Sequence, residues 1–483
     1  MPIPDTSSSL EASCAAPGGG APRGSGPLLR PWPVGRAERR LAAAALVVRA
    51  VFWLLLAAEP QRAYVGGDGR DYMGLAANLL AEGRLTLHSA LPLQADYSRP
   101  PLYPGFLACI RAVSGPIHLA PEIAVGAVQC ALSVWTCLLA YRLARRIWPA
   151  ARTGCALAAA WLALDPSVAV FGCLVMTETL FMVLWIAAAA CLDEAFGRGE
   201  RGTRLAHWLA ACLLLALAAL TRPIGQAAIA VAGACWLASG LRVRGPAGRC
   251  PAGRLAAGLM AGLVVFSLPL LAWSLRNRAV GGPFALSDVG PFNFLLYTYQ
   301  LDSPGATDEE IWRDAMAEAQ AILDRHPGDV GGAHAEMAAR GRARLLADPG
   351  MLLRGTAVGL AETAVSPAYE LFPFLGLAPE CTPPIAGSAA LRAALRAAPA
   401  ITSWRLGLMI WTASASALAA IALVRGWRRL ACTTLAFVVL LALAHAALGA
   451  LAGSGRFRVP IAPLIAVVAA GARGGAAPTG RRP

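Results

Sequence analysis

The chain has 483 residues, of which 57% are hydrophobic and only 14% are charged. A soluble domain has about a quarter of its residues charged, so this composition excludes an ordinary water-soluble protein. The net charge is +14, but all 42 basic residues are arginines that fall in short clusters between apolar segments. Because no basic face carries interleaved aromatic residues, the charge favours a membrane protein and argues against nucleic acid as a partner.

Residues 1–40 are rich in Ser, Gly, Pro and Ala and contain no apolar segment. They therefore predict a disordered cytoplasmic tail rather than a cleavable signal peptide. The first apolar segment begins at Leu41, directly after Arg36, Arg39 and Arg40. We expect it to act as an uncleaved signal anchor. Residues 472–483 predict a second disordered cytoplasmic tail.

Residues 41–471 predict one all-α integral membrane domain. The apolar residues come in blocks of about 18–22, the length that crosses a hydrocarbon core. Such blocks must be helical, because lipid satisfies no backbone polar group. About ten transmembrane helices are predicted, at 41–58, 119–141, 153–170, 171–192, 205–220, 224–241, 255–274, 404–424, 430–451 and 458–471.

The arginines predict how these helices are oriented. With the N-terminus cytoplasmic, every predicted cytoplasmic loop contains arginines, such as Arg145 and Arg146 after the second helix or Arg425 after the eighth. This agrees with the positive-inside rule. We therefore expect a multi-pass protein of the cell (plasma or inner) membrane with both termini in the cytoplasm.

Two long segments, 59–118 and 275–403, are then extracytoplasmic. Loops of this length usually carry function. The first contains a predicted short amphipathic helix at 72–81, with Leu75, Leu79 and Leu80 on one side. The second contains predicted polar helices near 308–324 and 333–347. Neither segment is large enough for a separate catalytic domain, so we expect chemistry where these loops meet the membrane.

The first loop contains candidate catalytic residues. Asp68 follows the first helix by about ten residues, which tethers it near the outer surface, and Asp71, Tyr72 and Tyr103 follow. A carboxylate there can serve as general base for an acceptor hydroxyl or amine, or can bind a cation. Arg99 lies near the membrane boundary, where its guanidinium can bind phosphate oxygens. The alternative is a solvated loop carboxylate and an interfacial arginine.

Two further acidic residues lie close to or within predicted membrane helices. Ionisable residues there are costly and suggest function. Asp165, which precedes Pro166, is expected at the outer end of its helix and near the level of Asp68. Glu178, after Thr177, is expected about two turns into the next helix. It either binds an outer-loop group or pairs with an arginine.

Five arginines, Arg222, Arg276, Arg278, Arg456 and Arg458, are exceptions to the positive-inside pattern, because they fall at outer helix ends. Binding of an anionic lipid phosphate would explain positive charge there. Snorkelling to outer-leaflet headgroups is the alternative.

The sequence predicts no metal site and no cofactor, although a role for a divalent metal stays open. The cysteines show no CxxC pair and the histidines no HExxH spacing. No Walker loop or GxGxxG motif indicates nucleotide hydrolysis.

Taken in order, these motifs resemble the GT-C superfamily of polytopic glycosyltransferases, in the family 39-like branch of protein mannosyltransferases and aminoarabinose transferases. The resemblance covers about 41–471. It rests on Asp68, Tyr72 and the run from Arg99 to Pro104, and then on Thr177-Glu178, Arg222-Pro223, Arg276-Asn277 and Arg456-Phe457-Arg458.

The resemblance implies a polyprenyl-phosphate sugar as donor, an extracytoplasmic acceptor (lipid, protein or envelope polysaccharide) and inversion at the anomeric carbon. It implies that Asp68 activates the acceptor, that Arg99 takes the basic position before the Pro-Pro pair, and that Arg456 or Arg458 faces the phosphate. Asp165 resembles a second outer carboxylate of the aminoarabinose transferase branch. The relatives often have Asp-Glu where this chain has Asp68-Gly69, which leaves Asp71 as an alternative base.

Two other classes compete with this hypothesis. A flippase or transporter would move a lipid-linked sugar without bond chemistry, although such proteins more often show internal repeats and broken helices. A non-catalytic structural membrane protein would leave the outer carboxylates and arginines without a purpose.

Overall fold

The computed structural model describes residues 35–65, 68–87, 95–197, 201–242, 244–245, 248–249, 252–302, 308–377, 398–426, 432–449 and 455–473, together with residues 29, 33 and 396. The predicted tails therefore lie almost entirely outside the described residues. At the N-terminal side, the first helix begins at Arg36 rather than at Leu41.

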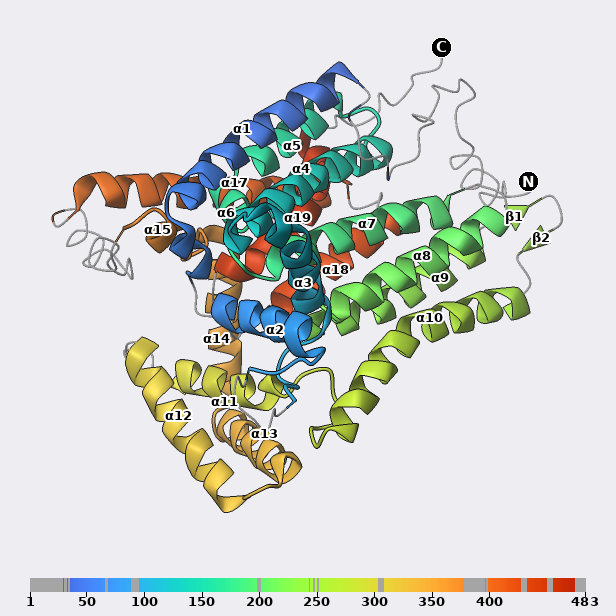
Figure 1. The fold of residues 1–483 in the computed structure, drawn as a ribbon. Coiled ribbons are helices and arrows are strands. Elements are labelled where there is room, and N and C mark those ends of the chain that lie inside the picture. The colour runs from blue at the N-terminus through green and yellow to red at the C-terminus, as the bar shows by residue number, and fades with distance from the viewer. Residues whose placement is uncertain are drawn as a thin grey trace, which may run out of the picture.

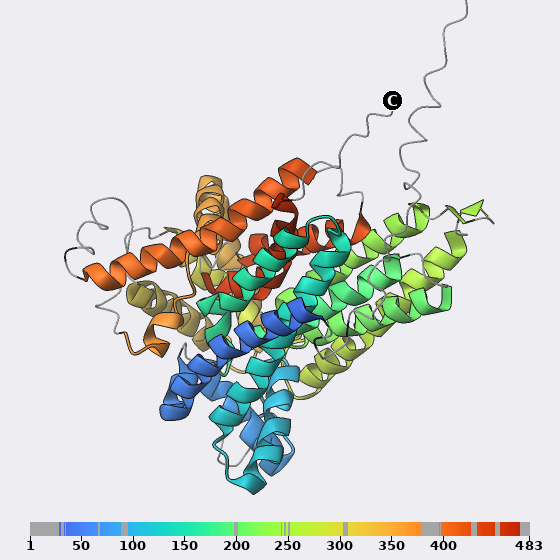
Figure 2. The ribbon, with the colours of Figure 1, turned by 90° about the horizontal axis from the view of Figure 1, so that it is seen from above.

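The chain folds into helices that gather in one bundle (Figure 1), and in the view from above α1, α5, α7, α8 and α17 run along a common direction (Figure 2). The elements are α1 (Arg36–Ala58), η2 (Pro60–Tyr64), α2 (Asp68–Glu82), α3 (Leu102–Ser114), η3 (Gly115–Ile117), α4 (Pro121–Ile147), α5 (Arg152–Leu164), α6 (Pro166–Val170), α7 (Glu178–Phe196), α8 (Arg201–Ala219), η4 (Pro223–Ala227), α9 (Ala228–Arg242), β1 (Arg244–Gly245), β2 (Gly248–Arg249), α10 (Ala252–Ala279), α11 (Val289–Asp302), α12 (Asp308–Arg325), α13 (Val330–Ala347), α14 (Pro349–Val365), α15 (Leu371–Phe374), α17 (Pro399–Gly426), α18 (Thr433–Gly449), η8 (Gly455–Ile461), α19 (Ala462–Ala469) and η9 (Ala470–Arg473). The strands β1 and β2 form one short antiparallel pair.

The helices confirm an all-α integral membrane fold. Within the described residues, seven helical segments are long and apolar enough to cross a membrane: Arg36–Ala58, Pro121–Ile147, Glu178–Phe196, Pro223–Gly240, Ala252–Ala279, Pro399–Gly426 and Gly455–Ala472. Three shorter apolar helices are Arg152–Leu164, Arg204–Ala219 and Thr433–Gly449. Together they correspond one to one with the ten predicted transmembrane helices.

The boundary between the third and fourth predicted helices was wrong. Helix α5 ends at Leu164, because Pro166 cannot continue it and restricts the residue before it. Asp165 instead caps the short helix α6, with its carboxylate accepting from the backbone N–H groups of Ser167 and Val168. A turn follows, and α7 begins at Glu178. Glu178 therefore lies at the start of its helix and not two turns inside it.

The predicted helices of the long outer segments are present. Helix α2 contains the predicted 72–81 stretch, and α12 and α13 contain the two polar stretches. In α2 the buried face includes Tyr72, Leu75 and Ala76, whereas Leu80 is 48% exposed. The prediction that Leu80 shares this face was wrong, because the buried stripe is centred one turn earlier. Helices α11, α12 and α13 form a group below the bundle (Figure 1) around a small core of their own that includes Leu295, Ile322 and Met337.

One end of the bundle is tied together by buried and half-buried ion pairs. Arg142 on α4 pairs with Glu38 at the start of α1, at 2.9 Å, and Arg146 pairs with Asp193 and Glu194 at the end of α7. Thr434 at the start of α18 donates to Asp193 at 2.9 Å. These contacts bring the beginnings of α1 and α18 together with the ends of α4 and α7, which is the alternation that the arginine pattern predicted.

Helix α10 packs closely on α8 and α9 through two glycines four residues apart. Trp208 of α8 donates to the carbonyl of Gly258 at 2.8 Å, and a Cβ at Gly262 would lie 2.3 Å from its Nε1. Small residues at this spacing let membrane helices approach closely.

We predict that Gly262→Ala lowers the thermal stability of the detergent-solubilised protein, by about 1–3 kcal/mol, because the methyl group overlaps the indole ring. Gly253→Ala in the same helix is the control, since a Cβ there meets nothing within 4 Å. Because a gain in helix propensity favours alanine in both variants, equal melting temperatures for the two would contradict this packing.

Candidate active site

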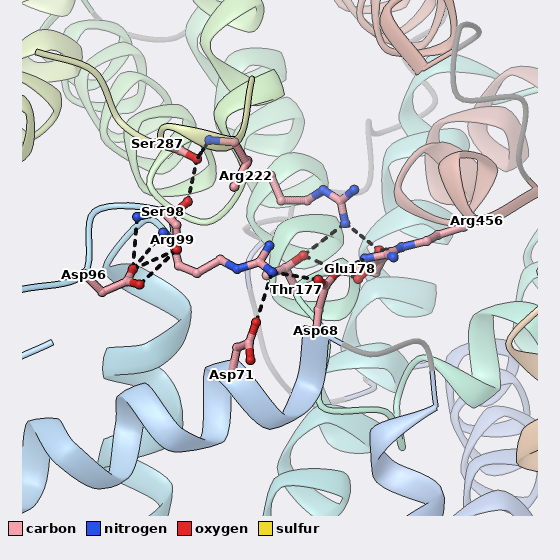
Figure 3. Close-up of polar contacts among 11 residues, drawn as sticks. Asp68, Asp71, Asp96, Ser98, Arg99, Thr177, Glu178, Arg222, Ser287 and Arg456 are labelled. Carbon is pink, nitrogen blue, oxygen red and sulfur yellow. Dashed lines mark hydrogen bonds and ion pairs between the residues drawn. The ribbon is translucent and has the colours of Figure 1, made fainter. Parts of the chain in front are cut away.

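Five charged residues from distant parts of the chain meet at the opposite end of the bundle (Figure 3). Asp68 begins α2, Arg99 precedes α3, Glu178 begins α7, Arg222 follows α8, and Arg456 lies in η8. They form a continuous chain of ion pairs, Arg99–Asp68–Arg456–Glu178–Arg222. We call these five residues the ionic cluster.

Asp68 lies between two guanidiniums. Its Oδ1 is 2.7 Å from Nη2 of Arg99, and its Oδ2 is 3.4 Å from Nη2 of Arg456. The start of α2 can reach this position because Gly69 packs against the turn before α7: a Cβ at Gly69 would lie 3.0 Å from the carbonyl oxygen of Val175. The Asp68 side chain is 30% exposed, so its carboxylate is accessible to a substrate.

Arg99 is positioned by a turn that Asp96 organises. The Asp96 carboxylate accepts from the backbone N–H groups of Ser98 and Arg99, at 3.0 and 3.2 Å. The guanidinium then extends over the ring of Tyr72, 5.2 Å from its centroid, and reaches Asp71 at 3.4 Å as well as Asp68. Because Arg99 has donors to spare, it can also bind phosphate oxygens.

Glu178 is the fully buried centre of the ionic cluster. Its Oε1 is 2.5 Å from Nε of Arg456 and 2.5 Å from Nη1 of Arg222. Nη1 of Arg222 also donates to the Thr177 hydroxyl at 3.0 Å. The start of a helix favours a carboxylate, since the helix dipole is positive there. Of the two roles expected for Glu178, the geometry favours pairing with arginines.

The predicted tyrosines, Tyr72 and Tyr103, pack beside Arg99 of the ionic cluster. The rings of Tyr72 and Tyr103 meet edge to face, with centroids 5.0 Å apart. The Tyr103 hydroxyl donates to the side chain of Gln129 at 3.0 Å, and Gln129 in turn donates to the carbonyl of Leu174 at 2.6 Å. The first predicted outer loop is thereby connected to α4 and to the turn before α7.

Asp165 and Arg458 form a separate pair. Both side chains are 0% exposed, and Nη1 of Arg458 is 2.9 Å from Oδ2 of Asp165. The other oxygen of Asp165 caps α6. Among the described residues, no contact joins this pair to Asp68, so the expected convergence of the two carboxylates is not seen. Arg458 lies two residues from Arg456 in η8, which makes the pair an anchor for that segment.

Arg276 lies beside the ionic cluster but not in it. Its Nη1 donates to the carbonyl of Asp96 at 2.5 Å, and its guanidinium lies 4.6 Å from the centroid of Trp273. It supports the turn that holds Arg99.

Sequence reasoning missed several residues of the site. Glu370 lies 3.9 Å from Arg456. Tyr297 of α11 is close enough to the ionic cluster for the charges of Arg222, Arg456 and Asp68 to act on its hydroxyl group. Asp96 and Gln129 hold Arg99 and Tyr103 in place. Only Glu370 carried a signal, as a single acid in the apolar stretch 365–377. Within the part of the chain that the structure describes, no group of three or more His, Cys, Asp or Glu is arranged to hold a metal.

The fold and the ionic cluster together define a multi-span helical membrane protein with an arginine–carboxylate site where its loops meet the bundle. The family model of dolichyl-phosphate-mannose-protein mannosyltransferases matches residues 110–250, a stretch that includes Glu178 and Arg222. Over this stretch the chain is similar to the protein mannosyltransferase type of the GT-C superfamily, which is the resemblance that the sequence predicted. No curated protein sequence matches the chain.

The solved structures that are similar to the chain include two membrane proteins crystallised with a lipid phosphate. The archaeal oligosaccharyltransferase AglB from Archaeoglobus fulgidus, in complex with an inhibitory peptide and a dolichol-phosphate, aligns with a TM-score of 0.48 and 12% identity over 91% of this chain and 50% of its own. This chain thus spans about half the length of AglB. ArnT from Cupriavidus metallidurans, bound to undecaprenyl phosphate, aligns with a TM-score of 0.37 and 15% identity over 90% of this chain and 76% of its own.

We predict that Glu178→Ala destabilises the protein by about 3–5 kcal/mol, because it leaves two guanidiniums without their shared buried carboxylate. The measurement is thermal unfolding of the purified protein in detergent, followed by tryptophan fluorescence. Glu82→Ala, at an exposed position in α2, is the control. If both variants melt with the wild type, Glu178 does not hold the ionic cluster together.

Proposed function

We propose that the chain is a membrane glycosyltransferase that moves a sugar from a polyprenyl-phosphate donor to an extracytoplasmic acceptor. The observation that carries this proposal is the position of the Asp68 carboxylate between Arg99 and Arg456. One acidic and two basic groups at one point are what the transfer needs, namely a proton acceptor and a stabiliser of the leaving phosphate. The match to a dolichyl-phosphate-mannose-dependent family supports the donor class.

The arginines bind the donor's phosphate in this mechanism. The bond between the anomeric carbon and the phosphate oxygen breaks, and the electron pair leaves with the polyprenyl phosphate. Arg99 and Arg456 carry partly exposed guanidiniums that stabilise the charge developing on that phosphate. The proximity of Asp68 also orients both guanidiniums before the donor binds, so little reorganisation is needed.

Asp68 is then the base. A phosphate that binds Arg99 and Arg456 competes with Asp68 for their donors, and this frees carboxylate oxygens to accept the proton of the attacking hydroxyl or amine. The new bond forms between the acceptor and the anomeric carbon, and one in-line displacement inverts that carbon. Asp71, which is 47% exposed and 3.4 Å from Arg99, is the alternative base. The predicted catalytic role of Asp165 stays a prediction, and its fully buried pair with Arg458 favours a positioning role instead.

We predict that Asp68→Asn lowers the transfer rate by about 10²–10⁴-fold while donor binding is retained, because the base is lost and the arginines are not. The measurement is incubation of the purified protein with a panel of labelled polyprenyl-phosphate sugars, followed by isolation of labelled product. Asp71→Asn tests the alternative base and should lower the rate less than Asp68→Asn does.

The same experiment distinguishes a flippase. A protein that only moves the lipid-linked sugar across the membrane yields no labelled product, and Asp68→Asn leaves its transport almost unchanged. A larger loss in Asp71→Asn than in Asp68→Asn would transfer the role of base to Asp71.

We also predict that Arg99→Ala weakens binding of polyprenyl phosphate by about 10–100-fold, since it removes a charge-assisted contact to the phosphate. Binding is measured directly by calorimetry or by competition against the donor. Arg84→Ala, an exposed change after α2, is the control for non-specific loss of positive charge. Equal affinities for the two variants would exclude Arg99 from the phosphate site.

A further inference from the structure

Glu370 lies against the ionic cluster, at the end of a segment that contacts both α6 and η8. The residues from Ser366 to Glu370 connect α14 to α15. The backbone N–H of Ala368 donates to the Ser167 hydroxyl of α6 at 3.1 Å, and this bond fixes the position of the segment. At Gly455, at the start of η8, an added Cβ would lie 2.5 Å from the carbonyl oxygen of Pro367. The segment therefore lies directly on the helix that carries Arg456.

The Glu370 carboxylate has little bonding of its own. The residue is 6% exposed, and its Oε1 is 3.9 Å from Nε of Arg456, too far for a strong hydrogen bond. Its Oε2 is buried and has no hydrogen-bond partner within the described part of the chain. Burial raises the pKa of this carboxyl group, and the nearby charges of Arg456 and Arg222 only partly oppose that effect.

Glu178 and Glu370 differ in how closely they approach the arginines. Both carboxylates face Arg456, but Glu178 accepts two guanidiniums at 2.5 Å, whereas Glu370 approaches Arg456 only to 3.9 Å. Buried acceptors in folded proteins almost always have a partner, because an unsatisfied one is costly. The backbone around Glu370 is fixed, and its Oε2 is unpaired beside the site. This oxygen is therefore suited to accept a hydrogen bond from a group of the substrate.

The chemistry of the proposed polyprenyl-phosphate sugar indicates which substrate group donates this hydrogen bond. A phosphate is excluded, since its oxygens are acceptors and its charge would repel a carboxylate. The sugar, in contrast, offers several hydroxyl groups. Arg456 is the proposed phosphate ligand, and the sugar is bonded to that phosphate. Glu370, which lies beside Arg456, would therefore also lie beside the sugar. We propose that Glu370 is a substrate-contacting residue that accepts a hydrogen bond from one hydroxyl of the donor sugar and so selects the sugar.

This inference rests on the proposed function, and its test begins with the donor that the labelled panel identifies. The wild type and Glu370→Ala are each assayed with that donor and with its monodeoxy analogues. With the complete donor, we expect Glu370→Ala to lower kcat/KM by about 10- to 100-fold, the range for a hydrogen bond to a charged group. One monodeoxy analogue should cause a similar loss in the wild type but almost none in Glu370→Ala, because the two changes remove the same contact.

Additive losses for every analogue would overturn the inference, because a residue that merely positions Arg456 affects all donors equally. Glu370→Gln keeps an acceptor oxygen and should lose less than Glu370→Ala, which provides a second reading if the alanine variant is unstable. Glu362→Ala, on an exposed turn of α14, is the control and should match the wild type. If the wild type itself transfers no sugar, the proposed function fails instead, and that result is distinct from additive losses.

Discussion

The site depends on one buried interaction, the Glu178 carboxylate that Arg222 and Arg456 share. Each guanidinium comes from a chain segment far from α7 in sequence, and each would be costly to bury without this carboxylate. The beginning of α7 contributes its dipole to the same point. Removal of Glu178 would leave Arg222 and Arg456 without the carboxylate that they share, and Arg456 would lose a contact that holds it beside Asp68.

The two ends of the bundle use ion pairs differently. At the end that includes Arg142 and Arg146, the pairs join helix ends to each other and account for the carboxylates there. At the other end, the pairs leave Asp68 partly exposed and Glu370 unsatisfied. The Asp165–Arg458 pair is fully buried and both oxygens of Asp165 have partners, although Nε and Nη2 of Arg458 have none among the described residues. This difference in accessibility is why the proposed mechanism uses Asp68 and not Asp165.

The proposed reaction follows from this balance between pairing and access. Guanidiniums that are already oriented by carboxylates bind a phosphate with little loss of side-chain entropy, and the phosphate then competes for the same donors. Arg99, held by the Asp96 turn and the Tyr72 ring, and Arg456, held by Glu178, approach Asp68 from two sides. A donor that binds both arginines would thus place its anomeric carbon near the base and near Glu370.

The amino-acid sequence by itself determined the class of fold, because apolar blocks of membrane-spanning length have no stable alternative to helices in lipid. It also indicated Asp68, Arg99, Glu178, Arg222 and Arg456, since charges at predicted helix ends stand out against an apolar background. The tertiary structure alone decided which of them meet. Pairing depends on how α2, α7 and η8 pack, and a local pattern does not contain that information. For the same reason Asp165 was expected beside Asp68 but pairs with Arg458, and Glu370 acquired its significance only when the chain folded it against Arg456.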